Sequence, residues 1–183
     1  FMGFGVSACA VCDGFFYKGQ EVVVVGAGDT AAEEATYLAK ICPKVTLLVR
    51  RDQMRASKAM QNRVLNTDNI EIKWNTETVE IQGGQSVETV VVKNTLTGEI
   101  ENIAASGFFV AIGHKPNTDI FKGILDMDET GYLTPTLGKT AANKPGVFAA
   151  GDVADKVYRQ AVTAAGTGCM AALESERYLS EFH

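Results

Sequence analysis

The chain has 183 residues and a formal net charge of −5, with 46% hydrophobic and 21% charged residues, as is typical of a globular protein. Its acidic balance, with Lys and Arg scattered, argues against a general nucleic-acid binder. No apolar run approaches the roughly 18 residues that a membrane span requires, so we expect no membrane protein. The cysteines are too few and too unevenly spaced for a secreted disulfide scaffold, which favours a cytoplasmic, reducing location.

The first part of the chain predicts a β-α-β unit. Residues 21–25 are an apolar, β-branched run typical of a buried parallel strand, and a glycine turn follows at 26–28. A helix is expected over 29–41 and a second strand over 44–50. Strand, turn, helix and strand in this order predict parallel pairing through a right-handed crossover.

The middle of the chain predicts an antiparallel meander inserted between parallel elements. A helix is expected over about 57–65, and short strands separated by glycine-containing turns are expected at 70–74, 79–82, 87–93 and 99–103. A buried apolar strand over 107–113 then returns to the parallel sheet.

The character of the sequence changes after Gly113, where we place a domain boundary. Beyond it we expect a short helix over 118–125, strands over 131–134 and 146–150, and a long helix over about 160–179. This second part is short of sheet, which is typical of an incomplete domain.

The turn after the first strand matches a dinucleotide-binding pattern. Gly26 to Ala31 reads G-x-G-x-x-A: the first glycine allows a tight turn, the second lets the backbone approach a pyrophosphate, and the small third residue lets helix and strand pack closely. The diphosphate would then lie on the free N–H groups at the start of the helix. A second match at 166–171 has no strand before it, and we interpret it as small residues within a helix.

The end of the second strand indicates which nucleotide binds. An NAD site would place Asp or Glu about 20 residues after the glycine turn, to bind the ribose 2′-OH. This chain instead has Arg50, Arg51 and Arg55, and guanidinium groups suit a 2′-phosphate through bidentate hydrogen bonds. We therefore expect NADP(H), with a solvated basic turn as the alternative.

A C-x-x-C motif stands directly before the β-α-β unit. Cys9 and Cys12 can close a small disulfide loop, and in such motifs one thiolate is often stabilised as a nucleophile for thiol–disulfide exchange. Asp13, next to the second thiol, could shuttle a proton. A zinc site is the less favoured alternative because no second C-x-x-C is present. Cys42 and Cys169 are interpreted as core residues.

Motifs extend over six segments, at 9–17, 26–35, 50–56, 109–114, 145–152 and 158–172. Together they resemble the bacterial low-molecular-weight thioredoxin reductases over nearly the whole chain. The resemblance implies an α/β fold of the FAD/NAD(P)-binding pyridine nucleotide-disulfide reductase type. Such a fold is a Rossmann-like parallel sheet with an inserted antiparallel meander, here followed by an incomplete FAD-domain segment.

The resemblance also implies an activity: electrons pass from NADPH through FAD to the Cys9–Cys12 disulfide and on to thioredoxin, in a protein whose full-length form is a homodimer. Cys12 would face the flavin, Cys9 would attack the thioredoxin disulfide, and Asp13 would act as acid and base.

The resemblance also implies which residues bind the cofactors. The diphosphate region would be held by Gly26, Gly28, Asp29 and Thr30, and the 2′-phosphate by Arg50, Arg51 and Arg55. Asp152 would bind the ribityl chain of FAD, and the flavin would lie along Arg159, Gln160 and Ala161.

Members of this family begin with an FAD-binding unit that is not found before Cys9 here. We therefore expect a fragment with an NADPH-binding domain carrying the dithiol over 1–113 and the C-terminal part of a split FAD-binding domain over 114–183. Its FAD site would be incomplete and it would not turn over alone. Two alternatives remain: an NADP(H)-binding module with a redox dithiol but no catalysis, and the flavoprotein subunit of an alkyl hydroperoxide reductase. The latter uses NADH, and the three arginines argue against it.

Overall fold

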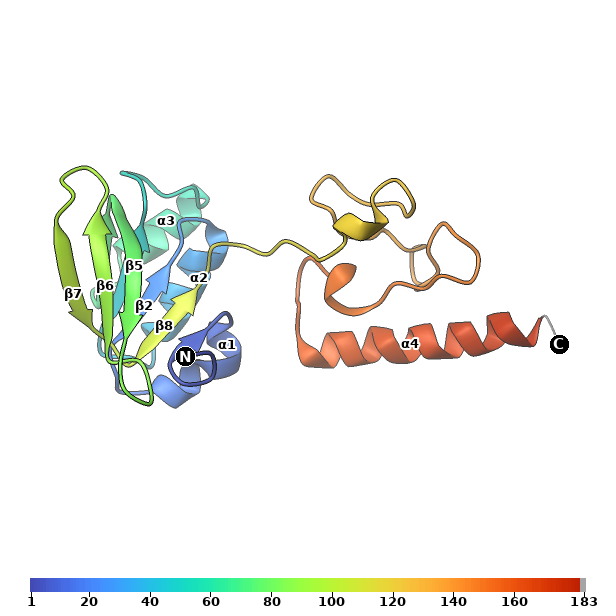
Figure 1. The fold of residues 1–183 in the computed structure, drawn as a ribbon, viewed down its shortest axis with the longest axis horizontal. Coiled ribbons are helices and arrows are strands. Elements are labelled where there is room, and N and C mark those ends of the chain that lie inside the picture. The colour runs from blue at the N-terminus through green and yellow to red at the C-terminus, as the bar shows by residue number, and fades with distance from the viewer. Residues whose placement is uncertain (182–183) are drawn as a thin grey trace. The chain divides into compact units, whose positions relative to one another are not determined.

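The computed structural model describes residues 1–181 and divides the chain into two compact units, Phe1–Gly113 and a second one from His114 onward. The first unit contains a five-stranded sheet in the order β1-β8-β2-β3-β4 and a three-stranded sheet in the order β5-β6-β7 (Figure 1). All pairs in the larger sheet are parallel, and those in the smaller sheet are antiparallel. The predicted α/β class, a parallel sheet with an inserted antiparallel meander, is confirmed.

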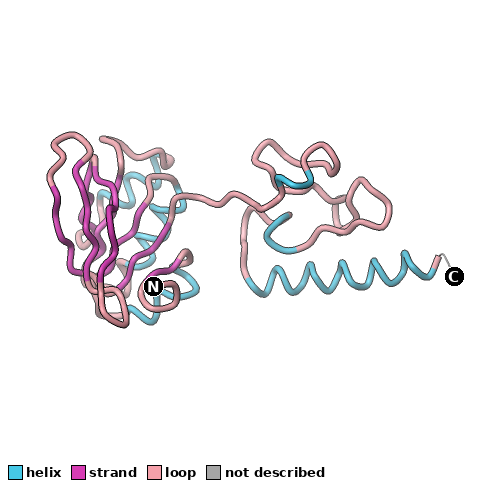
Figure 2. Tube along the Cα trace, viewed as in Figure 1, coloured by secondary structure: helices cyan, strands magenta, loops and turns pink. Residues whose placement is uncertain are grey.

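Short elements make up the first unit (Figure 2). The parallel sheet consists of β1 (Val6–Ser7), β2 (Val22–Val25), β3 (Val45–Val49), β4 (Ile70–Trp74) and β8 (Gly107–Val110). The meander consists of β5 (Thr76–Gln82), β6 (Thr89–Asn94) and β7 (Ile100–Ala104). The helices are α1 (Ala10–Asp13), the 3-10 helix η1 (Gly14–Tyr17), α2 (Asp29–Leu38) and α3 (Lys58–Leu65).

The parallel sheet is buried on both faces, which is why its central strands are apolar throughout. Val22 and Val24 belong to a core cluster with residues of α2 and α3, such as Leu38 and Val64. Val23, whose side chain points to the opposite face, packs instead with residues of β6 and β7. The first unit is therefore three layers: helices, parallel sheet and meander.

The position of strand β4 differs from the prediction. The sequence assigns residues 70–74 to the antiparallel meander, but this strand pairs in parallel with β3 at the edge of the larger sheet. Its alternation of apolar and charged residues is the cause of the error, because an edge strand with one exposed face shows the same pattern as a meander strand. The chain turns from β4 into the meander at Asn75, which has a left-handed backbone (φ 51°).

The second unit contains less regular structure than the sequence predicts. Its elements are the 3-10 helices η2 (Asp119–Phe121) and η3 (Gly151–Val153) and the long helix α4 (Ala161–Ser180). The prediction of strands at 131–134 and 146–150 is wrong. Each segment forms only one isolated β-bridge, between Met127 and Leu133 and between Ala141 and Phe148. The backbone of these segments forms other hydrogen bonds instead. The Leu133 N–H donates to the Val153 carbonyl oxygen, and the Ala149 N–H donates to the Thr140 carbonyl oxygen.

Helix α4 is confirmed close to its predicted bounds, and the match at 166–171 lies within it. The expectation that Cys169 is a core residue is wrong, because α4 has no buried residue and this thiol is exposed. Cys42, in contrast, is buried in the first unit as predicted. Among residues 1–181, no helix combines the length and apolar character needed to cross a bilayer.

Gly26 lies close to the backbone of a neighbouring segment of the parallel sheet. A Cβ at this position would lie 2.2 Å from the Ala111 carbonyl oxygen and 2.8 Å from the Ala31 Cβ, and φ is +153°. At Gly28, by contrast, a Cβ would meet nothing within 4 Å, and φ is −91°. The two glycines of the motif therefore have different structural requirements.

We predict that Gly26→Ala destabilises the first unit by about 1–3 kcal/mol, because the added methyl group overpacks a site bounded by backbone. Gly28→Ala should change stability by less than about 1 kcal/mol, because the space is open. Urea unfolding followed by the fluorescence of Trp74, the single tryptophan, measures both. Equal losses in the two variants would contradict this assignment.

Candidate nucleotide and disulfide sites

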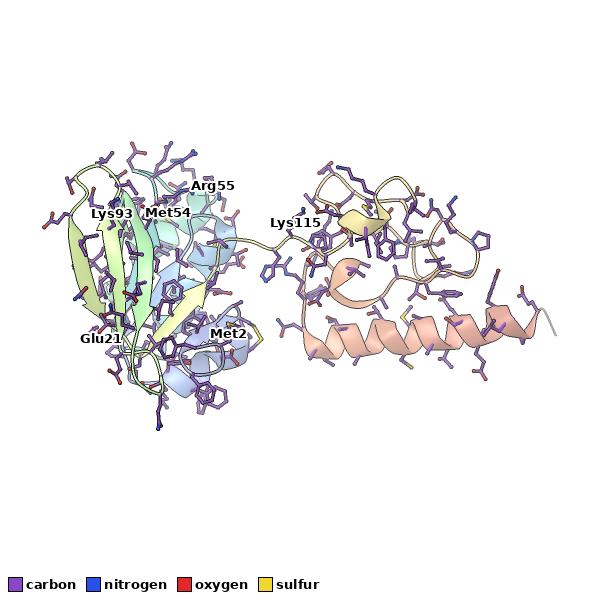
Figure 3. The ribbon with its side chains drawn as sticks, in the orientation of Figure 1. Met2, Glu21, Met54, Arg55, Lys93 and Lys115 are labelled. Atoms are coloured by element: carbon purple, nitrogen blue, oxygen red, sulfur yellow. A yellow bond between two sulfur atoms is a disulfide. The ribbon has the colours of Figure 1, made fainter. Side chains whose placement is uncertain are left out.

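A cleft of about 750 Å³ opens at the carboxyl-terminal edge of the parallel sheet. It lies at the ends of the paired strands β2 and β8. The chain proceeds from β2 to β3 on one side of β2, whereas β8 pairs on the other side. Open parallel sheets bind ligands at this kind of switch point, and the volume suits a drug-sized or nucleotide-sized ligand. Arg55 marks this edge in Figure 3, and Glu21 marks the opposite edge.

Five of the predicted nucleotide-binding residues line the cleft: Gly26, Gly28, Thr30, Arg50 and Arg55. Two others do not. Arg51 is exposed outside the lining, and Asp29 instead accepts a hydrogen bond from the Ser57 backbone N–H (2.8 Å). Asp29 therefore has a structural role, because it ties the start of α2 to the start of α3.

The arginine loop is also tied directly to the glycine turn. The backbone N–H groups of Arg55 and Ala56 both donate to the Ala27 carbonyl oxygen, at 2.7 and 3.0 Å. These bonds hold a cationic side chain next to the turn where a diphosphate would lie. The sequence motif does not reveal this link, because it joins segments that are far apart in the chain.

The sequence analysis missed two groups of cleft residues. Thr76, Glu77 and Thr78 of β5 form one wall, and Ile112 and Gly113 after β8 form another. The Thr78 hydroxyl is buried and has no hydrogen-bond partner in the described chain. No local pattern marks these residues, since they reach the cleft only through the packing of the meander on the sheet.

A second cleft, of about 730 Å³, lies at the opposite edge of the sheet. Its lining includes Glu21 and Glu88 but no Lys or Arg. Repulsion from these carboxylates makes it unsuited to a phosphate, so the arginine-lined cleft is the better nucleotide site.

The C-x-x-C motif forms a disulfide in the first unit. Cys9 and Cys12 are joined, with their Cα atoms 5.3 Å apart, and the Cys12 backbone N–H donates to the Cys9 Sγ at 3.2 Å. Cys12 is exposed and Cys9 is partly buried. In the described chain, no group of three or more His, Cys, Asp or Glu could hold a metal ion, so nothing there supports the zinc alternative.

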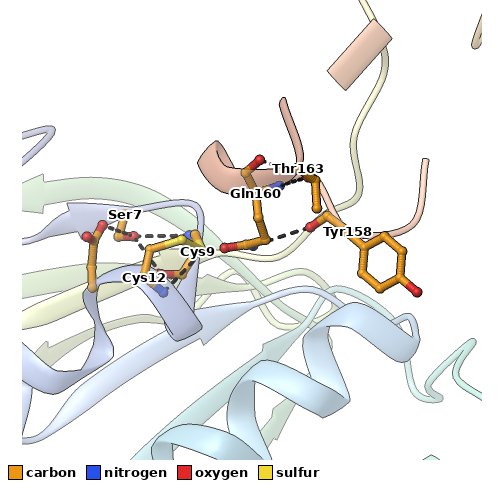
Figure 4. The surroundings of a disulfide bond; sticks show 7 residues. Ser7, Cys9, Cys12, Tyr158, Gln160 and Thr163 are labelled. Carbon is orange, nitrogen blue, oxygen red and sulfur yellow. Dashed lines mark hydrogen bonds between the residues drawn. A yellow bond between two sulfur atoms is a disulfide. The ribbon is translucent and has the colours of Figure 1, made fainter. Parts of the chain in front are cut away.

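Ser7 orders the start of this motif (Figure 4). Its buried hydroxyl donates to Asp13 Oδ2 at 2.7 Å and accepts a hydrogen bond from the Cys9 backbone N–H at 3.0 Å. Tyr17 anchors the following turn, with its ring edge-on to Phe109 of β8 and the ring centroids 5.3 Å apart. The carboxylate of Asp13 is therefore held beside the cysteines.

Glu34 is a further group at this site that the sequence analysis did not identify. Its side chain is half-buried on α2, and its Oε2 is buried without a hydrogen-bond partner in the described chain. Burial raises the pKa of Glu34 to about 7; the nearby backbone N–H of Ala10 opposes this shift, and the charge of Glu33 adds to it.

In the second unit, the predicted flavin residues lie on one ordered segment. Asp152 is exposed on η3, and Gln160 caps α4 through reciprocal hydrogen bonds with Thr163 (Figure 4). Arg159 has a left-handed backbone (φ 47°), and Ala161 is the first residue of α4. These residues follow one another along a chain segment, as contacts to an extended cofactor require.

Asp155 holds this segment in shape. Its carboxylate accepts hydrogen bonds from the backbone N–H groups of Val157, Tyr158 and Arg159 at 2.8–3.0 Å and from the Thr163 hydroxyl at 3.1 Å. These bonds lower the pKa of Asp155, although desolvation acts against them. The strained backbone of Arg159 is thus supported locally.

Comparison with known proteins places these features in a family. Residues 1–168 match the family model described as pyridine nucleotide-disulphide oxidoreductase. The chain is 58% identical to a thioredoxin reductase of Dictyostelium discoideum over 178 residues, covering 96% of this chain and 56% of that protein. It is 54% identical to one of Streptomyces clavuligerus, covering 97% and 55%.

A solved structure of a thioredoxin reductase is also similar to this chain. Thioredoxin reductase from Streptococcus pyogenes MGAS5005 superposes with a TM-score of 0.90 at 40% identity, covering 97% of this chain and 58% of that one. The chain thus spans little more than half the length of the relatives it matches.

We predict that the stability of the first unit falls as the pH rises from about 4.5 to about 7 because of Glu34. In this range the folded chain retains a proton that the unfolded chain has lost, so each rise in pH favours unfolding, and above pH 7 this contribution is constant. We expect a fall of about 1–2 kcal/mol, less than the full pKa shift implies because the carboxyl group is only partly buried.

Urea unfolding of the unmodified chain and of Glu34→Gln, at several pH values, measures this effect. The variant should lack the fall between pH 4.5 and 7, whereas the exposed neighbour variant Glu33→Gln should retain it. The same pH profile in all three proteins would show that Glu34 titrates normally.

Proposed function

The chain belongs to the pyridine nucleotide-disulphide oxidoreductase family, and we propose on this premise that it serves as the part of a thioredoxin reductase that binds NADPH and carries the redox-active disulfide. The observation that carries the proposal is the arrangement of the first unit. The arginine-lined cleft and the Cys9–Cys12 disulfide both follow strands of one parallel sheet at their carboxyl ends.

In this proposal, 1–113 is the NADPH-binding domain and 114–183 is the C-terminal part of a split FAD-binding domain. The turn at Gly26, Gly28 and Thr30 receives the diphosphate, with Asp29 supporting it. Arg50, Arg51 and Arg55 hold the 2′-phosphate through charge-assisted hydrogen bonds. The small residues at the turn leave room for backbone N–H groups to contact the phosphates.

FAD, when bound, supplies the two-electron relay between the nicotinamide and the disulfide. We propose that Asp152 binds its ribityl hydroxyls and that Arg159, Gln160 and Ala161 line the flavin. The exposed carboxylate of Asp152 and the ordered segment behind it fit this role.

The cysteines have separate roles in the proposal: Cys12 faces the flavin, and Cys9 attacks the thioredoxin disulfide. The Cys12 N–H that donates to the Cys9 Sγ favours a thiolate on Cys9, because a hydrogen bond to the charged form lowers a thiol pKa. Asp13, held beside the pair by Ser7, exchanges protons with the sulfurs. Thioredoxin as partner, a cytoplasmic location and a homodimer of the whole protein complete the proposal.

We predict that Arg50→Ala and Arg55→Ala each weaken NADPH binding by about 10-fold to 100-fold, because each removes a charge-assisted hydrogen bond of about 1.5–3 kcal/mol. NADH, which lacks the 2′-phosphate, should bind the variants and the unmodified chain about equally. Titration calorimetry with both nucleotides measures the difference, and Arg63→Ala on the exposed face of α3 is the control. An equal loss for NADH would favour the solvated basic turn.

The roles of the cysteines predict which variant traps thioredoxin. The probe is a thioredoxin with its second active-site cysteine replaced and its first bonded to thionitrobenzoate. In Cys12→Ser, the Cys9 thiolate should attack this disulfide, form a protein–protein disulfide and release thionitrobenzoate, whose absorbance gives the rate. Cys9→Ser should react at least about tenfold more slowly, since it loses the thiolate that the hydrogen bond favours.

Both variants should carry Cys169→Ser, because that thiol is exposed and would react as well. Faster reaction of Cys9→Ser would reverse the assignment. No adduct with either variant, despite normal folding and NADPH binding, would favour a nucleotide-binding module without this partner.

A further inference from the structure

The arginine loop, residues 50–57, connects β3 to α3. Its burial alternates near its end: Met54 and Ala56 are buried in the core of the first unit, whereas Arg55 between them is exposed and lines the cleft. Figure 3 labels Met54 and Arg55 at the edge of the sheet where the cleft opens. Burial of both neighbours restrains the backbone on each side of this cation.

Gln61 of α3 binds the backbone on both sides of Arg55. Its side-chain amide donates to the Ala56 carbonyl oxygen at 2.7 Å and to the Met54 carbonyl oxygen at 3.4 Å. The backbone N–H groups of Arg55 and Ala56 in turn donate to the Ala27 carbonyl oxygen at 2.7 and 3.0 Å. These four hydrogen bonds tie the backbone around Arg55 to both α3 and the glycine turn.

The surroundings of Gln61 orient its amide toward the loop. Its backbone N–H donates to the Ser57 carbonyl oxygen at 2.9 Å, which fixes its place at the start of α3. Its Oε1 accepts a hydrogen bond from the Lys58 ammonium group at 3.5 Å, so that the NH₂ group faces the two loop carbonyls. A carboxylate of the same shape could not form these bonds, because it only accepts hydrogen bonds.

The start of the loop is held by different contacts. The Asn75 N–H donates to the Arg51 carbonyl oxygen at 3.1 Å. The Thr95 N–H donates to the Asn75 carbonyl oxygen at 2.6 Å, and the Thr95 hydroxyl donates to the same oxygen at 3.1 Å. Gln61 therefore supports the end of the loop around Arg55, whereas the meander supports its start.

We propose that Gln61 is a positioning residue for recognition of the 2′-phosphate, which holds the backbone around Arg55 so that the guanidinium group faces the cleft before the nucleotide binds. This inference rests on the proposed function for the identity of the nucleotide. Gln61 itself lies outside the cleft lining and acts through Arg55. A loop that is already ordered loses less conformational entropy on binding, so these bonds favour the nucleotide that carries the 2′-phosphate.

The first experiment measures nucleotide preference. Gln61→Met keeps the length of the side chain and removes the amide donors. It should weaken NADPH binding by about three- to tenfold, because the loop around Arg55 must then be ordered on binding, and change NADH binding by less than about twofold. Titration calorimetry with both nucleotides measures the two affinities. Equal losses for NADPH and NADH would reduce Gln61 to a structural residue and overturn the proposal.

The neighbouring residue of α3 provides a matched control. Asn62 is exposed, and Asn62→Leu replaces an amide by an apolar side chain of similar size in the same helix. Both affinities should stay unchanged in this variant. A loss of NADPH affinity as large as that of Gln61→Met would assign the effect to α3 as a whole and overturn the proposal.

Double variants test whether Gln61 acts through Arg55. In an Arg55→Ala background, Gln61→Met should weaken NADPH binding no further, because the group that it positions is already absent. In an Arg50→Ala background its effect should persist, because Arg50 lies at the start of the loop. An undiminished effect in the Arg55→Ala background would overturn the proposal.

A measurement on the unmodified chain without nucleotide does not depend on the folding of any variant. NMR hydrogen exchange compares the side-chain amide protons of Gln61 with those of Gln53, which is exposed on the same loop. The Gln61 protons should exchange at least about tenfold more slowly, because they are bonded to the loop before any ligand arrives. Equal exchange rates would overturn the proposal.

The outcomes separate this inference from the proposed function. If the unmodified chain binds NADPH no more tightly than NADH, the proposed function is refuted, and the role of Gln61 in recognition with it. If the unmodified chain prefers NADPH and Gln61→Met retains the full preference, this inference alone is refuted.

Discussion

The parallel pairing of β2 with both β3 and β8 is the constraint on which the rest of the first unit depends. The Gly26 N–H donates to Leu48 of β3 at 3.1 Å, while the Ala111 N–H, just after β8, donates to Val25 of β2 at 2.9 Å. The glycine turn is thus held between two neighbouring strands, and the Ala111 carbonyl leaves no room for a side chain at Gly26. Because the chain leaves β2 towards β3, whereas β8 pairs on the other side of β2, the cleft opens at this point.

Helix α2 packs beside both the glycine turn and the disulfide segment. Thr30, in its first turn, lines the arginine-lined cleft. Ala31 and Ala35, four residues apart on one face of α2, share a core cluster with Ala10, the residue after Cys9. Because these residues are small, the helix approaches both the sheet and the disulfide segment closely, so the packing of α2 positions both sites.

Sequence reasoning succeeded where a local pattern determines the structure. The apolar runs of β2 and β3 and the glycine turn predicted the β-α-β unit, because only strands buried on both faces are apolar throughout. It failed where long-range packing determines the structure. The alternating pattern of β4 does not specify its partner, and nothing local distinguishes half-buried Glu34 from exposed Glu33. The roles predicted for Arg51 and Asp29 rest on motif position, whereas their side chains lie outside the cleft lining.

The second unit is ordered mainly by polar contacts rather than by a large core. Its buried cluster is small, with Leu125, Leu133 and Ala149, and α4 buries no residue. Hydrogen bonds also stabilise this unit. Glu174 of α4 accepts hydrogen bonds from the backbone N–H and the hydroxyl of Thr140, and Asp155 accepts hydrogen bonds from three consecutive backbone N–H groups. Such local bonds hold the segment 151–161 in a defined shape without needing a packed layer beneath it. A segment held in this way is preorganised, so little conformational entropy would be lost on binding the proposed cofactor.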